Sequence, residues 1–165
     1  MLMMIERLLG VRPHLEQVLQ ELKHDLLSNK EWARLSECHS ILLPFKEHTD
    51  YLQTDTLSLS SVIPCLLELS LHLKDQSLPR AHADTLLKSL HQRFSVFLDP
   101  TCPSFDPLPA AACLLDPTVA RVLLRDDMVQ LLEAAKTYTK AQVRDYNSEK
   151  LLTEYYAISL HKVVC

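Results

Sequence analysis

Apolar residues recur every three or four positions along most of the chain, and the clearest run follows Ser28. Ser28 and Glu31 have the spacing of a capping box, in which the serine hydroxyl accepts a hydrogen bond from the third helical N–H and the glutamate reaches back to the serine amide. Trp32, Leu35 and Leu42 then fall on one side of the helix. The pattern predicts a helix that begins at Ser28 and buries its tryptophan.

Proline interrupts this helix at Pro44, because the residue lacks an N–H and its ring clashes with the preceding turn. The helix is expected to stop or kink there before Phe45 resumes the apolar pattern. The same spacing predicts further helices over residues 2–9, 13–26, 62–73, 83–97, 117–124, 127–145 and 149–164. Their expected N-caps are Ser60 or Ser61, Asp116, and Asp126 or Asp127.

Composition favours an all-α fold. Leucine far outnumbers valine and isoleucine, and the single glycine leaves little for the turns of β-hairpins. A chain of 165 residues can bury one self-standing core, so residues 1–165 are expected to form a single domain of about six to eight helices. Residues 99–109 hold four prolines and are interpreted as an ordered loop rather than a domain boundary. The expected core includes Trp32, Leu35, Leu42, Phe45, Leu66, Leu69 and Phe94.

Net charge and cysteine usage narrow the class of protein. A formal charge of −4 gives no overall field toward nucleic acid or an anionic membrane. The five cysteines are odd in number and lack close repeated spacing, which favours reduced thiols in the nucleus or cytoplasm. The first residues carry Glu6 within an apolar run and no cationic leader, and no run of about 20 apolar residues occurs, so neither a secretory signal nor a membrane span is expected.

Histidine and cysteine are numerous, yet their spacing does not predict a metal site. No C-x2-C pair occurs, Cys38 and His39 are adjacent and point about 100° apart on a helix, and Cys65 lies two turns from His72. Core cysteines and surface or half-buried histidines are the preferred interpretation. No metal or other cofactor is expected.

Three aspartates precede proline and are the nearest approach to a catalytic set. Asp99, Asp106 and Asp116 could hold two divalent ions for phosphoryl transfer. Asp-Pro is also a common turn and cap dipeptide, and turn chemistry is the preferred interpretation. A nucleophile elbow of the G-x-S-x-G type needs two glycines, and this chain has one. The sequence therefore predicts a protein that is not an enzyme.

Two features could bind a partner. Lys136, Lys140 and Arg144 follow one another at spacing four and form a basic stripe, the best local candidate for nucleic-acid contact, although a solvated helix face is the preferred interpretation beside nearby acidic residues. The apolar segments 2–9 and 151–164 either pack within the chain or dock on another chain.

Four motifs occur in an order that carries a family resemblance. They read EWARLSECHSILLPFKEHTDYL, LSLSSVIPCLLELSLHL, LLKSLHQRF and AAACLLDPTVARVL. From about residue 4 to about residue 140 the chain resembles hAT-superfamily transposases and the vertebrate zinc finger BED domain-containing proteins derived from them. The resemblance implies the all-helical insertion of an RNase H-like transposase core. It also implies that Trp32 matches the tryptophan at the start of that insertion, which in active relatives handles flanking DNA and here is expected in the core.

The chain departs from the family in the parts that carry chemistry. It lacks the BED zinc finger, the strands that bring the first two catalytic aspartates, and the later segment with the catalytic glutamate and much of the dimerisation surface. Asp116 matches the leucine-aspartate-proline motif, which supplies no metal ligand in the family, and Thr118 stands where an arginine is usual. The segment that contains Asp116 and Thr118 is therefore not expected to bind nucleic acid.

Three functional hypotheses follow. The first is a non-catalytic, domesticated hAT-derived helical domain that binds an unidentified protein or itself, in the nucleus by family resemblance and otherwise in the cytoplasm. The second is a DNA- or chromatin-binding accessory module that uses Lys136, Lys140 and Arg144. The third is a residual strand-transfer enzyme that depends on Asp116 and a divalent metal ion.

Overall fold

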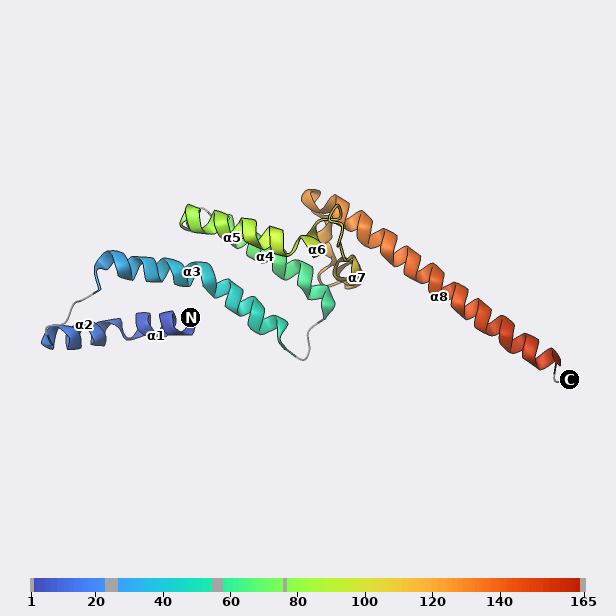
Figure 1. Cartoon of the computed structure of the whole chain (residues 1–165), viewed down its shortest axis with the longest axis horizontal. Helices are drawn as coiled ribbons and strands as arrows, with labels where there is room; N and C mark the ends of the chain where they lie inside the picture. The colour runs from blue at the N-terminus through green and yellow to red at the C-terminus, as the bar shows by residue number, and fades with distance from the viewer. Residues whose placement is uncertain (1, 23–26, 55–57, 76, 164–165) are drawn as a thin grey trace. The chain divides into compact units, whose positions relative to one another are not determined.

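The protein is all-α in the part that the computed structural model describes, residues 2–22, 27–54, 58–75 and 77–163, with side chains described outside 147–149 and 151–163 (Figure 1). Eight α-helices, three short 3-10 helices and no strand occur there, which confirms the predicted fold class. The α-helices are α1 Leu2–Gly10, α2 Arg12–Glu21, α3 Asn29–Leu52, α4 Val62–Leu73, α5 Arg80–Arg93, α6 Ser95–Leu98, α7 Leu108–Leu115 and α8 Val129–Val163. The 3-10 helices are η1 Leu59–Ser61, η2 Ala120–Leu124 and η3 Asp126–Met128.

The chain divides into two compact units. The first combines residues 1–57 with 65–93, and the second combines 58–64 with 94–165. The first unit contains α1, α2, α3, α5 and most of α4, and the second contains α6, α7 and α8. Organisation as one domain stays a prediction, and each unit is described by itself.

The start of α3 confirms the predicted capping box. The Ser28 backbone N–H donates to Glu31 Oε2 at 2.8 Å, and the Glu31 N–H donates to Ser28 Oγ at 3.3 Å. These bonds satisfy N–H groups that would otherwise lack a partner at the helix start. The helix continues through Pro44 to Leu52 without stopping, and its ribbon bends along its length in Figure 1.

In the first unit α1 packs against α3. Ile5 of α1 is buried, and Trp32 of α3 is only 2% exposed. The Arg12 guanidinium of α2 lies over the Trp32 ring at 5.0 Å from its centroid, a cation–π arrangement. His39 Nε2 lies 3.5 Å from a carboxylate oxygen of Glu6, which joins α3 to α1. The tryptophan therefore anchors the place where the first three helices meet.

Later helices of this unit are joined by further side-chain contacts. His48 Nε2 of α3 lies 3.4 Å from a carboxylate oxygen of Glu68 of α4. The Ser70 hydroxyl of α4 lies 3.2 Å from His91 Nε2 of α5. Helix α2 ends at Glu21, one turn or more before the predicted end, and residues 23–26 lie outside the described part of the chain.

The expected core residues differ in burial. Trp32, Leu66 and Leu69 are buried, whereas Leu35, Leu42, Phe45 and Phe94 are half-buried. The most completely buried large side chains lie elsewhere, at Ile63, Leu73 and Leu123. Helical periodicity identifies the apolar face of a helix, but which part of that face lies deepest depends on contacts with distant segments.

Several helix starts in the second unit differ from the predicted ones. The N-cap is Ser58, at the start of η1, the short helix that leads directly into α4. Its side chain accepts a hydrogen bond from the Ser60 N–H. Asp116 ends α7, and the segment after it forms a turn and the 3-10 helix η2 instead of an α-helix over 117–124. Asp127 forms an ion pair with Arg125, and α8 begins only at Val129.

Helix α8 is also longer than predicted, because the two helices expected over 127–145 and 149–164 form one continuous backbone helix from Val129 to Val163. The proline-rich loop is ordered by hydrogen bonds and spans 99–107, since Leu108 and Pro109 already belong to α7. The Asp106 N–H donates to the Val96 carbonyl at 2.7 Å, which closes the loop back onto α6.

Candidate functional site

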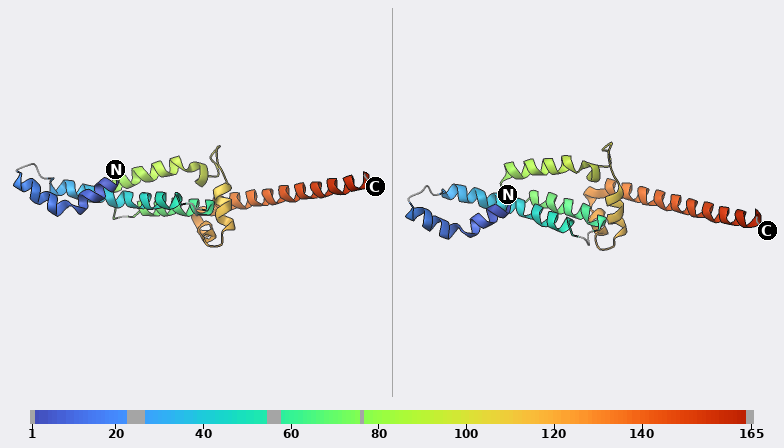
Figure 2. Two further views of the ribbon diagram at one scale, coloured as in Figure 1. Left: turned by 90° about the horizontal axis from the view of Figure 1, so that it is seen from below. Right: turned by 60° about the horizontal axis from the view of Figure 1, so that its bottom comes forward.

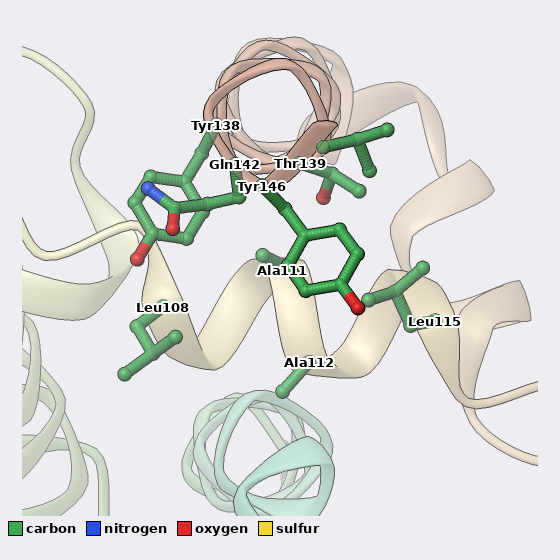
Figure 3. Close-up of a pocket in the computed structure, with 9 residues that line it drawn as sticks. Leu108, Ala111, Ala112, Leu115, Tyr138, Thr139, Gln142 and Tyr146 are labelled. Atoms are coloured by element: carbon green, nitrogen blue, oxygen red, sulfur yellow. The ribbon is translucent and has the colours of Figure 1, made fainter. Parts of the chain in front are cut away.

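An apolar groove lies between α7 and α8 in the second unit (Figure 3). It has a volume of about 500 Å³ and is open to solvent along one side. Helix α7 contributes Leu108, Ala111, Ala112 and Leu115, and α8 contributes Tyr138, Thr139, Gln142, Val143 and Tyr146. In Figure 3 the Tyr146 ring projects from α8 toward α7 on the side of Leu115, and the two alanines of α7 lie between the leucines.

The composition of α7 explains why the groove is apolar. All eight of its residues, LPAAACLL, are apolar, so the helix has more apolar surface than its neighbours can cover. Ala110, Ala111 and Cys113 are buried against the rest of the unit, while Leu115 is 68% exposed. Burial raises the pKa of the Cys113 thiol to about 11, so this cysteine is an inert core residue.

Helix α8 supplies the opposite wall through its position on α7 and η2. Leu131 and Ala135 are buried near the start of α8. One and two turns later the same side of the helix carries Tyr138 and Gln142, and Tyr146 follows with 67% exposure. The helix therefore leaves its partners gradually, and its apolar side chains change from buried to exposed along the groove.

The polar groups of the groove wall are few. The Thr139 hydroxyl donates to the Ala135 carbonyl at 2.9 Å, which occupies its proton within the helix. Gln142 offers an amide, and the two tyrosines offer phenol groups. The nine lining residues include no carboxylate, histidine, cysteine or lysine. The groove can bind apolar side chains and orient them with a few hydrogen bonds.

A hydrogen-bonded cluster closes the end of α7. The Ser60 hydroxyl, 1% exposed by residue, donates to Asp116 Oδ2 at 2.6 Å. The Thr118 N–H and hydroxyl donate to Asp116 Oδ1 at 3.0 and 2.6 Å. These bonds hold the pKa of the Asp116 carboxyl below its ordinary value, and the bond from Ser60 has the largest effect. The cluster fixes η1 against the C-terminus of α7.

The three Asp-Pro aspartates share one local geometry. Asp99, Asp106 and Asp116 each accept a hydrogen bond at Oδ1 from the backbone N–H two residues later, at 2.9, 2.9 and 3.0 Å. This is the turn that aspartate forms with its own backbone. Asp99 also lies at an edge of a second, smaller hollow with residues 126–131. The geometry gives these carboxylates a role in turns.

Changing Asp116 to asparagine is expected to reduce the dependence of stability on acid pH. Because the folded-state pKa is depressed, the ionised carboxylate stabilises the fold above its ordinary pKa of about 3.9, and this contribution is lost as the pH falls through the folded value. Urea unfolding between about pH 5 and pH 2.5 should therefore show a smaller loss of stability for Asp116→Asn than for the wild type. Ser60→Ala should shift the profile in the same direction. Identical profiles for all three proteins would contradict a stabilising role of the ionised Asp116 carboxylate.

The basic stripe lies outside the groove lining. Lys136 Nζ is paired with Glu133 Oε1 at 2.7 Å, and this pairing lowers the pKa of Glu133. Lys140 and Arg144 are exposed one and two turns further along α8. The pairing reduces the positive field of the stripe, because an exposed ion pair presents little net charge to a phosphate.

The candidate metal ligands are not brought together. Cys38 is exposed, His39 lies beside Glu6, and Cys65 is buried with its thiol pKa raised by desolvation. In the described ranges no group of three histidine, cysteine, aspartate or glutamate residues could hold a metal ion. Within the same ranges, no helix is long and apolar enough to cross a membrane.

Comparison with known proteins shows a distant similarity. Zinc finger BED domain-containing protein 39 of Caenorhabditis elegans is 28% identical over 131 residues, which cover 77% of this chain and 14% of that protein. The chain thus spans about one-seventh of the length of this relative. No protein-family model matches the chain, and no solved structure matches it. The similarity supports a relationship to the zinc finger BED domain-containing proteins and agrees with the ordered motifs.

Sequence reasoning did not identify the groove. It predicted no helix over residues 108–115, where α7 forms one wall of the groove. The available signal was the excess of apolar residues around α7, since a helix that is apolar on every side must be wholly buried or must leave a face for a partner.

Proposed function

We propose that this chain is the helical insertion portion of an hAT-transposase-derived BED-type protein and that it acts in the nucleus, without catalysis, by binding another protein. The ordered motifs and the similarity to the nematode BED protein support its origin. The observation that carries the interaction is the groove between α7 and α8, which leaves Leu115 and Tyr146 exposed on walls made mostly of apolar side chains. Tyrosine is enriched at protein-binding surfaces, and an exposed apolar patch marks an interaction site.

The partner that fits this groove is an amphipathic helix with two or three leucine-like side chains on one face. Two helices form the walls, and a third helix laid along them would bury apolar residues spaced by three and four positions. The phenol and amide groups of Tyr138 and Gln142 can hydrogen-bond to the polar edge of such a helix. A partner helix of this kind does not require charged residues in the groove, and the nine lining residues include none.

Site-directed photo-crosslinking tests this function directly. A benzoylphenylalanine introduced at Gln142 places the reactive group in the groove, and the same residue introduced at Lys140 places it outside. The probe is nuclear extract treated with nuclease. We expect a defined protein to be captured from the Gln142 position, with the crosslinked residues on an amphipathic helix. The double change Leu115→Glu and Tyr146→Glu should reduce the capture at least about tenfold, because it places charge on the apolar wall.

A matched control separates this function from DNA binding. Reversing the charge of Lys136, Lys140 and Arg144 changes the same helix outside the groove and should leave the capture unchanged. Capture that is equal from both crosslinker positions, or that survives the groove changes, would contradict the groove function. Capture that disappears with nuclease and with the basic changes, together with salt-dependent binding of labelled duplex DNA, would favour the DNA-binding alternative.

A further inference from the structure

Helices α1 and α2 carry a second apolar surface that the fold leaves uncovered. Six apolar residues recur at alternating intervals of four and three, the spacing of a coiled-coil heptad. We call this set the N-terminal seam, and it consists of Met4, Leu8, Val11, Leu15, Val18 and Leu22. The face of α1 that contacts α3 is a different one, marked by the buried Ile5. Helix α1 is therefore apolar on two sides.

Four of the six seam residues are exposed. Met4 and Leu22, near its two ends, are 66% and 61% exposed, and Val11 and Val18 are each about half exposed. Leu8 and Leu15 are half-buried. Single exposed apolar residues are ordinary on a protein surface, but a continuous stripe of them marks an interaction site.

The break between the two helices does not disrupt the seam. Val11 separates α1 from α2 with φ −94° and ψ 2°. The Val11 N–H still donates to the Arg7 carbonyl at 3.0 Å, and the Leu15 N–H donates to the Val11 carbonyl at 2.9 Å. These helical bonds keep residues four apart on one side, and the two helices follow one another end to end in Figure 1, with a bend where they join in Figure 2.

We propose that the N-terminal seam pairs with the seam of a second copy of this chain, in antiparallel orientation. The charges beside the seam select this occupant. Arg7, His14 and Glu21 occupy the same flanking heptad position on the solvent side, with the cation at one end and the anion at the other. When two copies run in opposite directions, Arg7 of each faces Glu21 of the other, and the two His14 residues meet at the centre.

The same register aligns the apolar residues. With Arg7 opposite Glu21, Leu8 of one copy lies at the level of Val18 of the other, and Leu15 lies at the level of Val11. Leu22 then meets Met4, so every layer of the seam pairs a leucine with a smaller or more flexible residue. Charge and volume therefore agree on one arrangement.

The parallel arrangement is disfavoured by charge. It would bring Arg7 of each copy beside Arg12 of the other, which places two pairs of like charges together. The antiparallel pair has two Arg7–Glu21 pairs on the solvent flank instead. On the opposite flank Arg12 meets its equivalent once, and its charge is already paired with Glu16.

Sedimentation velocity of the full chain over a concentration series tests the pairing. The wild type is expected to form dimers, and Val18→Glu should raise the dissociation constant at least about 100-fold, because the buried charge enters the symmetric interface twice. Val129→Glu, the same change at an exposed valine of α8, should leave the dimer unchanged. Circular dichroism should show equal helix content in all three proteins.

Charge reversal gives the signature of the antiparallel register. Arg7→Glu alone and Glu21→Arg alone should each weaken the dimer about tenfold, since each places two like-charged pairs across the seam. An equal mixture of the two variants should restore dimers, because the mixed pair has opposite charges at both ends. A change that only damaged the fold would show no rescue on mixing.

Three results would overturn the proposal. The first is a wild-type chain that stays monomeric at about 1 mM, where even weak specific pairs associate. The second is a stronger dimer for Arg7→Glu, which indicates the parallel arrangement. The third is a mixture of the two charge variants no more dimeric than either alone. The proposal does not depend on the groove of α7 and α8, so the groove changes Leu115→Glu and Tyr146→Glu should leave dimerisation unaltered.

Discussion

Replacement of Trp32 with alanine is expected to lower the free energy of unfolding of the first unit by about 3–5 kcal/mol. The side chain is 2% exposed and lies where α1, α2 and α3 meet, so its loss leaves a cavity that the surrounding helices fill only in part. The substitution also removes the ring under the Arg12 guanidinium. Urea unfolding followed by circular dichroism measures the loss, and amide exchange should localise it to α1 and α3.

Trp32→Phe is the matched control. Apart from the cost of the smaller side-chain volume, we expect it to lower the free energy of unfolding by about 1 kcal/mol or less. The indole Nε1 is buried without a hydrogen-bond partner in the described part of the chain, so the wild type already carries an unsatisfied donor there. Phenylalanine removes this donor and keeps an aromatic face for Arg12, which offsets the smaller volume. Equal destabilisation by phenylalanine and alanine would show that the indole nitrogen, and not the bulk of the ring, holds the site.

Local signals allowed the most accurate sequence predictions. The start of α3 depends on Ser28 and Glu31, which are three residues apart and bond to each other directly. The helical class likewise follows from apolar spacing and the near absence of glycine. Such features arise within one or two turns of chain, so a single sequence contains all the information they need.

Contacts between distant segments account for the errors. Ser60 or Ser61 was expected to cap α4, but the Ser60 hydroxyl donates to Asp116, 56 residues away, and Ser58 provides the cap. Asp116 in turn ends α7 and holds a turn rather than starting an α-helix. A serine or aspartate before a helix can satisfy several partners equally well, and only the tertiary fold selects one.

The two candidate interaction surfaces differ in how visible they are in sequence. The N-terminal seam has a regular heptad, so its periodicity could be found without a structure, but its exposure could not. The groove has no periodic signal, because its walls come from α7 and from the middle of α8, and it exists only where the two helices diverge. The exposure of Leu115 and Tyr146 follows from the packing of both helices, which the sequence does not specify.

Placing glutamate at Ala135 is expected to destabilise the second unit by about 3–5 kcal/mol at neutral pH. Ala135 is fully buried in α8, and Ala110 and Ala111 of α7 are buried as well, so small residues set the close packing of these helices. A longer side chain overpacks this region, and its carboxylate would have no partner there. Ala141→Glu makes the same change on the exposed side of α8 and should cost little.

Acid pH separates the electrostatic part of this effect from the steric part. A buried carboxyl group has a raised pKa, so the penalty at Ala135 is smallest where the group is protonated in both states and grows as the pH rises above the ordinary carboxyl value. The stability difference between Ala135→Glu and Ala141→Glu should therefore be smaller near pH 4 than near pH 7. A difference that does not change with pH would assign the whole effect to overpacking. Because α7 and α8 also form the groove, Ala135→Glu should abolish crosslinking from Gln142, whereas Ala141→Glu should preserve it.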